Sequence, residues 1–246
     1  MKVIAVIPAR FAATRFPGKL LYKLDQHSVI ASTYLAVQKT NLFEEVIVAA
    51  DDHRIIEDVE SVGGKAIMTS SDHQSGSDRI AEVVKDKSVD IIVNVQGDEP
   101  FTAAEPLSLL IDVFKKDKNH LIDVATLMEK VDKREANNPN QVKVVFDHSH
   151  HALYFSRSVI PFARDESEVI DYFKHIGIYA YRKKALMDFV EFTPSPLEKI
   201  EKLEQLRYLE NGYKIKMVET HYKTIGIDTV EDLEMARKHL KRWNKN

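Results

Sequence analysis

The sequence predicts an α/β fold in which helices cover a largely parallel β-sheet. Short apolar segments rich in β-branched residues, typical of buried strands, alternate with longer segments whose apolar residues recur at helical spacing. The 246 residues suffice for one large domain with a core that needs no disulfides, and the chain has no cysteine. The alternation predicts crossovers between parallel strands, and we expect one domain over residues 1–246.

The first hundred residues contain the strongest alternation. Strands are expected at Val3–Ile7, Val46–Ala50, Lys65–Met68 and Ile91–Val95, with helices at Val29–Gln38, Arg54–Val62 and Ser77–Lys85. Pro8 lacks the N–H donor needed for further pairing and is expected to end the first strand, while Gly63 and Gly64 end the second helix. This part therefore predicts a βαβ nucleotide-binding half.

The remaining elements are expected to include a hairpin. A helix follows Pro106, and its apolar side consists of Leu107, Leu110, Ile111 and Phe114. Strands at Gln141–Phe146 and Ala152–Ser156 flank a polar turn, and a further strand is expected at Ile176–Tyr181. Helices are expected at Lys183–Glu191 and Pro196–Asn211, the latter with a buried stripe of Leu197, Ile200, Leu203 and Leu206. Thr229 and Asp232 form a capping-box pattern at the start of a last amphipathic helix.

Composition excludes several classes of function. The net charge of -3 provides no basic field for nucleic acid, and no apolar run approaches a membrane span. The apolar stretch at the N-terminus is too short for a signal-peptide core, so we expect a cytoplasmic protein. The lack of cysteine rules out thiolate metal sites and a cysteine nucleophile. His148, His150 and His151 in the polar turn lack the helical spacing of a metal site and are expected to be exposed.

A cationic loop (residues 10–19) follows the first strand. It contains Arg10, Arg15 and Lys19, together with small residues that allow a ligand to approach the backbone closely. The loop has neither the spacing of the common phosphate loop nor that of dinucleotide-binding folds. It predicts a binding site for an anion, most simply a polyphosphate, within a different nucleotide chemistry.

Two acids are candidates for a metal site. Asp98 follows the apolar strand that ends in Gln96 and Gly97, and ligands of open α/β sheets bind at the carboxyl ends of strands. Asp228 is expected to follow another short apolar strand, Thr224–Asp228. Carboxylates beside phosphates repel them unless a divalent cation lies between, and Mg²⁺ commonly uses one or two carboxylates with phosphate oxygens. Read singly, both acids also fit a turn or a helix entry.

The turn Asp72–Arg79 joins a strand to a helix and contains Ser75, Gly76 and Ser77. Small hydrogen-bonding residues in such a turn can hold a base or ribose edge. A plain helix cap by Ser77 explains the same pattern.

Together these segments resemble the 3-deoxy-manno-octulosonate (Kdo) cytidylyltransferase family, within the sugar nucleotidyltransferases. The resemblance covers nearly the whole chain and rests on IPARFAATRFPGK, DHQSGSDR, VNVQGDEP, NPNQVKVV, ALYFSRS, HIGIYAYR, PSPLEKIEKLEQLR and GIDTVEDL. It implies a single Rossmann-like nucleotidyltransferase domain with a mostly parallel central sheet, helices on both faces and a β-hairpin region for dimerisation and sugar binding. Residues 1–130 would mainly bind CTP, and residues 131–225 would mainly bind sugar and form a homodimer.

The activity that the resemblance implies is transfer of CMP from CTP to Kdo, releasing pyrophosphate, for lipopolysaccharide biosynthesis. It assigns catalysis to Arg10, Lys19, Asp98 and Asp228, with Mg²⁺ held by the two acids. The implied nucleotide-binding residues are Arg10, Arg15, Lys19, Ser75, Arg79, Gln96 and Gly97. The acceptor would be an acidic eight-carbon sugar, and the implied sugar-binding residues are Gln96, Arg157, His175, Tyr179, Glu204 and Gln205.

Other activities remain open at this point. The same phosphate and metal residues would serve a cytidylyltransferase for 8-amino-Kdo or another nonulosonic acid. A noncatalytic nucleotide-binding subunit would be expected to lose a metal acid or the loop lysine, whereas Asp98, Asp228 and Lys19 are all present. A glycosyltransferase would usually have a D-x-D motif after a strand, and here the strand ends in QGDEP.

Overall fold

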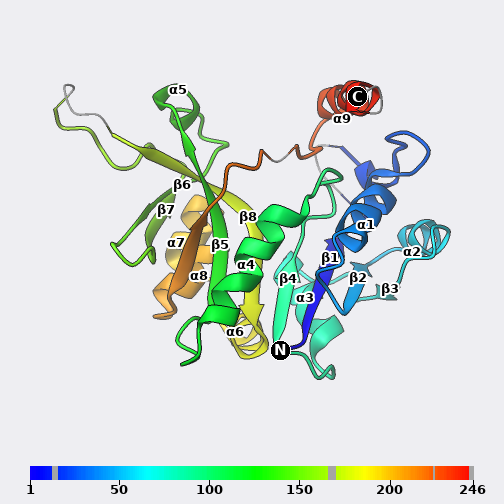
Figure 1. Ribbon diagram of the computed structural model, residues 1–246, viewed down its shortest axis with the longest axis horizontal. Helices are drawn as coiled ribbons and strands as arrows, with labels where there is room; N and C mark the ends of the chain where they lie inside the picture. Colours follow the sequence, from blue (N-terminus) through cyan, green and yellow to red (C-terminus); the bar gives the residue numbers. More distant parts are fainter. Residues whose placement is uncertain (13–15, 166–169, 224, 244–246) are drawn as a thin grey trace. The chain divides into compact units, whose positions relative to one another are not determined.

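The computed structural model describes residues 1–12, 16–165, 170–223 and 225–243 (Figure 1). Internal contacts divide the chain into two compact units. The first unit comprises Met1–Leu107 and Lys223–Asn246, and the second comprises Ser108–Tyr222. No helix among the described residues is both long and apolar enough to cross a membrane.

The first unit has a sheet of four parallel strands in the order β3-β2-β1-β4. These strands are β1 (Val3–Ala9), β2 (Glu45–Ala50), β3 (Ala66–Met68) and β4 (Ile91–Asn94). The helices that connect them are α1 (Val29–Lys39), α2 (His53–Glu60) and α3 (Gly76–Val84). Because crossovers between parallel strands are right-handed, the return from β3 to the far side of β1 places α3 on the face opposite α1 and α2. The strand order thus reverses between β1 and β4, where such sheets bind ligands at their carboxyl ends.

The prediction that β1 ends before Pro8 is wrong. β1 continues to Ala9, and Pro8 pairs in register with Ala49 of β2. Val6 accepts a hydrogen bond from Val95 N, so the alternate residue Pro8 also faces the β4 side, where pairing with β4 stops at Val6. The missing donor of Pro8 therefore breaks no ladder bond.

The second unit has a mixed sheet. In it β5 (Val124–Val131) pairs antiparallel with β8 (Tyr172–Arg182) and parallel with β9 (Ile215–Glu219). The predicted hairpin is confirmed as β6 (Lys143–Phe146) and β7 (Ala152–Ser156), and β6 also pairs with β8. The helices of this unit are α5 (Lys133–Ala136), α6 (Lys183–Glu191), α7 (Pro196–Glu201) and α8 (Gln205–Glu210), and α4 (Ala104–Lys116) contains the boundary between the units. The sequence did not indicate β5, β9 or α5.

The single helix expected at Pro196–Asn211 is wrong, because two short helices occupy the segment. The chain leaves α7 at Lys202, which has a left-handed φ of 55° and so cannot continue a right-handed helix. Ile200, a member of the expected buried stripe, is 77% exposed, whereas Leu203 and Leu206 are buried. The break at Lys202 rotates the second half of the stripe away from the first.

The last helix begins as predicted. The hydroxyl of Thr229 accepts the N–H of Asp232, the Asp232 carboxylate accepts the N–H of Thr229, and α9 runs over Val230–Trp243. The strand expected at Thr224–Asp228 is wrong for the described residues 225–228, which form no strand, and residue 224 lies outside them.

Candidate functional site

Lys19 joins two acids in the first unit. It begins the short 3₁₀ helix η1 (Lys19–Leu21) directly after Gly18, whose positive φ of 68° turns the chain. Its ammonium group donates to Asp98 Oδ2 at 2.5 Å and to Asp228 Oδ1 at 2.8 Å. Burial alone would lower the pKa of Lys19, but the charges and hydrogen bonds of Asp98 and Asp228 outweigh it and raise that pKa. The cationic loop and both predicted metal acids therefore meet at one point.

Asp228 reaches this point through main-chain contacts of the adjoining residues. Ile227 N donates to the carbonyl oxygen of Asp98 at 3.0 Å, which ties the segment before α9 to the loop after β4. Asp228 N donates to Asp232 Oδ2 at 3.1 Å in the first turn of α9. The main-chain bond to Asp98 and the cap of α9 thus place Asp228 beside Lys19, which was the role expected of the strand.

Gly97 allows the loop after β4 to approach β1. A Cβ atom added there would lie 3.0 Å from the carbonyl oxygen of Pro8 and 3.2 Å from Ile30 Cδ1. Gln96 precedes it, and its side-chain amide lies 3.5 Å from Asn94 Oδ1. The predicted nucleotide residues Gln96 and Gly97 therefore lie in the same loop as Asp98.

Glu99 gives this loop a second carboxyl group with different properties. Burial, with the neighbouring charge of Asp98 adding to it, raises the pKa of Glu99 to about 8. At neutral pH Glu99 is mostly protonated, so it adds no full charge beside Asp98.

The two acids on Lys19 fit a small divalent cation. Their carboxylate oxygens already converge on one cationic atom, and carboxylate oxygen is the ligand type that Mg²⁺ uses. No group of three or more His, Asp or Glu side chains with the arrangement of a metal site occurs among the described residues. His148 and His150 of the β6–β7 turn are exposed and His151 is partly buried, as the sequence predicted for the first two.

Polar side chains in and just after the turn before α3 form hydrogen bonds with other protein groups. Ser75, and not Ser77 as the capping interpretation had it, is the N-cap of α3, and its hydroxyl accepts Asp78 N in a capping box. Ser77 is buried in the first turn of that helix. Arg79 is buried and donates to Asp51 Oδ2 at 3.0 Å. Arg10 is exposed after β1, and Arg15 lies outside the described residues.

In the second unit, Arg157 is held at the end of α7. Its guanidinium donates to the carbonyl oxygens of Glu201 at 2.8 Å, Pro139 at 3.2 Å and Lys202 at 3.4 Å. The fully buried Lys143 supports the same segment, since its ammonium donates to the carbonyl oxygen of Arg157 at 2.6 Å. The main-chain N–H of Arg157 donates to Glu201 Oε2 at 3.0 Å, whereas the partners of its guanidinium are neutral carbonyls. The guanidinium charge can therefore serve a ligand carboxylate.

His175 and Tyr179 lie on either side of an irregularity in the β5–β8 pairing. The register shifts between Thr126 and Leu127, and the two rings lie 5.2 Å apart. His175 Nε2 lies 2.9 Å from Thr126 Oγ1, whose single proton is directed at the carbonyl oxygens of Ile176 and Ile178. The tautomer with Nε2 as donor and Nδ1 as acceptor fits this arrangement, because Thr126 has only one proton to donate. Burial lowers the pKa of His175 to about 3, so the ring is neutral.

Glu204 and Gln205 begin α8 near these rings. Burial, with the charges of Tyr181 and Glu204 adding to it, raises the pKa of Tyr179 well above its ordinary value. Glu204 is exposed, and Gln205 is buried. The second unit therefore gathers its predicted sugar residues around the junction of α7 and α8.

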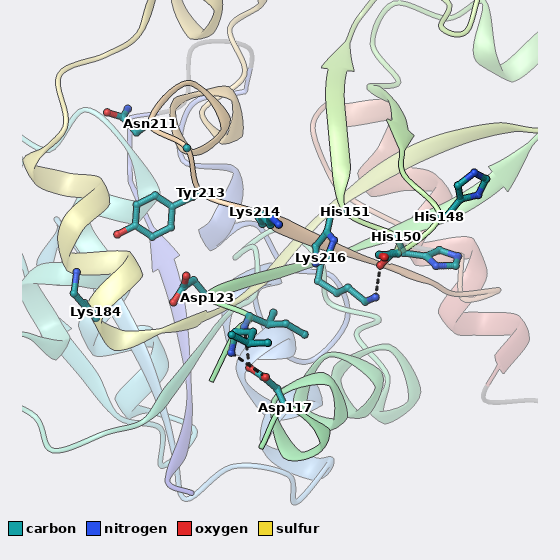
Figure 2. Close-up of a pocket in the computed structure, with 14 residues that line it drawn as sticks. Asp117, Asp123, His148, His150, His151, Lys184, Asn211, Tyr213, Lys214 and Lys216 are labelled. Atoms are coloured by element: carbon teal, nitrogen blue, oxygen red, sulfur yellow. Dashed lines mark hydrogen bonds between the residues drawn. The ribbon is translucent and has the colours of Figure 1, made fainter. Parts of the chain in front are cut away.

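A separate cleft of about 920 Å³ lies elsewhere in the second unit. Figure 2 shows the histidines of the β6–β7 turn at one end and Asp123, Lys184 and Tyr213 at the other. Asp117 in this cleft is paired with Arg182, and Lys216 donates to the carbonyl oxygen of Ser149. None of the predicted site residues lines this cleft.

Comparison with known proteins identifies the family. A cytidylyltransferase family profile matches residues 4–217. The 3-deoxy-manno-octulosonate cytidylyltransferase of Flavobacterium johnsoniae is 57% identical over 98% of this chain and 99% of its own length. The chain belongs to the 3-deoxy-manno-octulosonate cytidylyltransferase family. The protein of the same name from Christiangramia forsetii is 50% identical over 97% of both chains.

A solved structure supports the same membership in the 3-deoxy-manno-octulosonate cytidylyltransferase family. The structure of CMP:2-keto-3-deoxy-manno-octonic acid synthetase complexed with CTP has a TM-score of 0.93 and 40% identity, and covers 98% of this chain and 99% of its own. The family resemblance and the α/β nucleotidyltransferase fold predicted from the sequence are thus confirmed.

Several residues that contact the predicted nucleotide-binding or sugar-binding residues carried little or no signal in the sequence. Asp51 follows β2 at its carboxyl end, a position that could have singled it out alongside Asp98. Thr126, Lys143 and Glu201 read as ordinary strand and helix residues, because only the fold brings them to His175 and Arg157.

Proposed function

We propose that this chain transfers CMP from CTP to Kdo, releasing pyrophosphate and making the activated sugar for lipopolysaccharide biosynthesis. The observation that carries the proposal is the meeting of Lys19 with Asp98 and Asp228, a cation and two acids from three distant segments. Identity of 57% to a relative of that activity supports the choice of nucleotide and acceptor. A noncatalytic subunit would have no need to keep all three residues.

The cationic loop acts on the leaving group. The sugar hydroxyl attacks the α-phosphorus in line, and negative charge grows on the departing pyrophosphate. Arg10 and Lys19 stabilise that charge, and Arg15 of the same loop assists them. Ser75, Gln96 and Gly97 form the rest of the nucleotide side.

Asp98 and Asp228 would hold Mg²⁺. When bound, the ion supplies charge neutralisation at the phosphate oxygens and lowers the pKa of the attacking hydroxyl. The two acids would position it, and Lys19, which bonds both acids in this structure, would then be available to the phosphates.

The second unit recognises the acceptor. Arg157 binds the sugar carboxylate, since its guanidinium is held by neutral carbonyls and retains its charge. His175, being neutral, offers Nδ1 as a hydrogen-bond acceptor for a hydroxyl. Tyr179, Glu204 and Gln205 complete the polar set of the second unit for the other hydroxyls. Gln96 is assigned to the sugar by the family resemblance alone.

We infer that the enzyme works as a homodimer in the cytoplasm and as one nucleotidyltransferase domain. Large apolar side chains of the second unit are exposed, namely Leu153 in the hairpin, Phe162 and Ile200. A dimer that covers them accounts for this exposure. Sedimentation of the purified chain tests the dimer, and a monomer at micromolar concentration would exclude it.

Pyrophosphate release tests the activity. We expect release with CTP and Mg²⁺ in the presence of Kdo, and little with N-acetylneuraminate. An arm with 8-amino-Kdo distinguishes the two octulosonate acceptors, since the phosphate and metal residues serve both. Absence of release with either octulosonate would refute the proposal.

A further inference from the structure

A buried Arg–Asp pair in the first unit lies behind the cationic loop. The side chain of Arg79 is 4% exposed and that of Asp51 is 13% exposed. The guanidinium of Arg79 donates to Asp51 Oδ2 at 3.0 Å, to the hydroxyl of Thr69 and to the carbonyl oxygen of Ser70 at 3.2 Å. Arg79 is therefore bonded to the residues that follow β2 and β3.

Asp51 connects this pair to the cationic loop. While Oδ2 accepts from Arg79, Oδ1 accepts the main-chain N–H of Phe11 at 2.9 Å. Phe11 directly follows Arg10, so the carboxylate fixes the main chain beside the first cation of the loop.

Phe11 in turn holds the far end of the same loop. Its carbonyl oxygen accepts Gly18 N at 3.2 Å, immediately before Lys19. The ring lies 3.5 Å from the guanidinium carbon of Arg54, and a Cβ atom on Gly18 would come within 3.3 Å of it. Both ends of the loop that presents Arg10 and Lys19 are thus tied to one residue.

The Asp51–Arg79 pair carries no net charge, which suits a site for an anionic nucleotide. A carboxylate so close to the loop would repel a triphosphate if it were unbalanced. Arg79 balances it from the buried side and leaves Oδ1 free to accept Phe11 N–H. An arginine that contacted the nucleotide itself would have to give up this pairing.

We propose that Asp51 and Arg79 are positioning residues that fix the main chain at Phe11, where the cationic loop begins, for binding of the nucleotide triphosphate. They act through the main-chain N–H of Phe11. The inference rests on the CTP-binding part of the proposed function. It assigns Arg79 an indirect role, and it assigns Asp51 a role that no motif suggested.

Two double variants separate an indirect from a direct role. Asp51→Asn with Arg79→Met removes both charges and keeps an amide oxygen for Phe11 N–H, whereas Asp51→Leu with Arg79→Met removes the acceptor as well. Replacing both members of a buried ion pair often leaves stability unchanged. Asp117→Asn with Arg182→Met, the loss of a similar pair in the second unit, is the matched control.

The measurements are the Kd of Mg²⁺–CTP by calorimetry and the hydrogen exchange of the peptide that contains Phe11. We expect the Leu variant to bind at least about tenfold more weakly and the Asn variant within about threefold of the parent, since one hydrogen bond to a charged group is involved. Exchange at Phe11 should accelerate in the Leu variant only. The control pair should leave both readouts unchanged.

Equal losses of affinity in the Asn and Leu variants would show that Arg79 contacts the nucleotide, and parent-like affinity in both would show that the loop needs no such support. Either result overturns the inference. If the Leu variant fails to fold, Asp51→Ala with Arg79→Met takes its place, because alanine also offers no acceptor to Phe11 N and leaves no buried charge unpaired. Failure of Kdo turnover with intact CTP binding would count against the proposed function and leave this inference standing.

Discussion

The imidazole of His175 should make folding of the protein sensitive to mild acid. The ring of the partly buried His175 packs beside Phe155 and Tyr179, and its Nε2 lies 2.9 Å from Thr126 Oγ1. Burial lowers the pKa of His175 to about 3. In the unfolded chain the same ring titrates near its ordinary value of about 6.5. Below that value the unfolded chain binds a proton that the folded chain does not, so stability falls as the pH falls.

The size of the effect follows from the two pKa values. With a folded pKa of about 3, the penalty at about pH 5.5 is RT times the natural logarithm of 11, or about 1.4 kcal/mol. It grows by roughly 1.4 kcal/mol for each further unit until the folded pKa is reached. Above about pH 7.5 it vanishes, because neither state binds the proton.

Urea unfolding of His175→Gln and of the parent at about pH 7.5 and pH 5.5 measures this penalty. Glutamine can still donate to Thr126 but cannot titrate, so the parent should lose about 1.4 kcal/mol more than the variant between the two pH values. His148→Gln, at an exposed position of the β6–β7 turn, should follow the parent. Equal losses in His175→Gln and the parent would refute the neutral ring, and with it the hydrogen-bonding role given to His175.

Three further outcomes are expected. Asp98→Asn should lower pyrophosphate release at least about a hundredfold while far-UV dichroism and Tm stay near those of the parent, because it removes a charged metal ligand; near-normal release would contradict the metal assignment. Lys19→Met should also lower turnover, yet Mn²⁺ titrated without nucleotide should bind more tightly to it than to the parent, because the ammonium no longer occupies Asp98 and Asp228; weaker binding would exclude that competition. Lys202→Gly should raise the free energy of unfolding by about 0.5–1 kcal/mol, because glycine accepts the φ of 55° without strain, whereas Lys199→Gly inside α7 should lower it.

The local pattern of apolar residues was sufficient to predict those strands and helices whose structure depends mainly on residues of the same segment. The alternation in the first hundred residues predicted β1, β2, β4 and their helices closely, because β-branched runs and helical stripes report burial directly. It failed at Lys202, where the turn between α7 and α8 depends on a left-handed residue that no composition rule marks. β5 was missed because Glu129 and Lys130 interrupt its apolar run, and Glu129 is matched by Lys174 of the paired strand β8. Such a pair is visible only after the register is known.

In the candidate site, too, some contacts could be predicted from the sequence and others depend on the fold. The strand ends predicted that Lys19 and Asp98 would meet, because carboxyl ends of parallel strands lie on one edge of the sheet. Asp228 could not be placed that way. It lies 209 residues from Lys19 in the chain, and it arrives through Ile227 N on the carbonyl oxygen of Asp98 and through the cap of α9. A main-chain bond of this kind leaves no side-chain signature in the sequence. For the same reason Asp51 was overlooked, since its partner is the N–H of Phe11, which any residue except proline could supply. Motifs therefore reveal residues whose own side chains bind or react. Residues that bond to the main chain of a binding loop are recognised only in the folded structure.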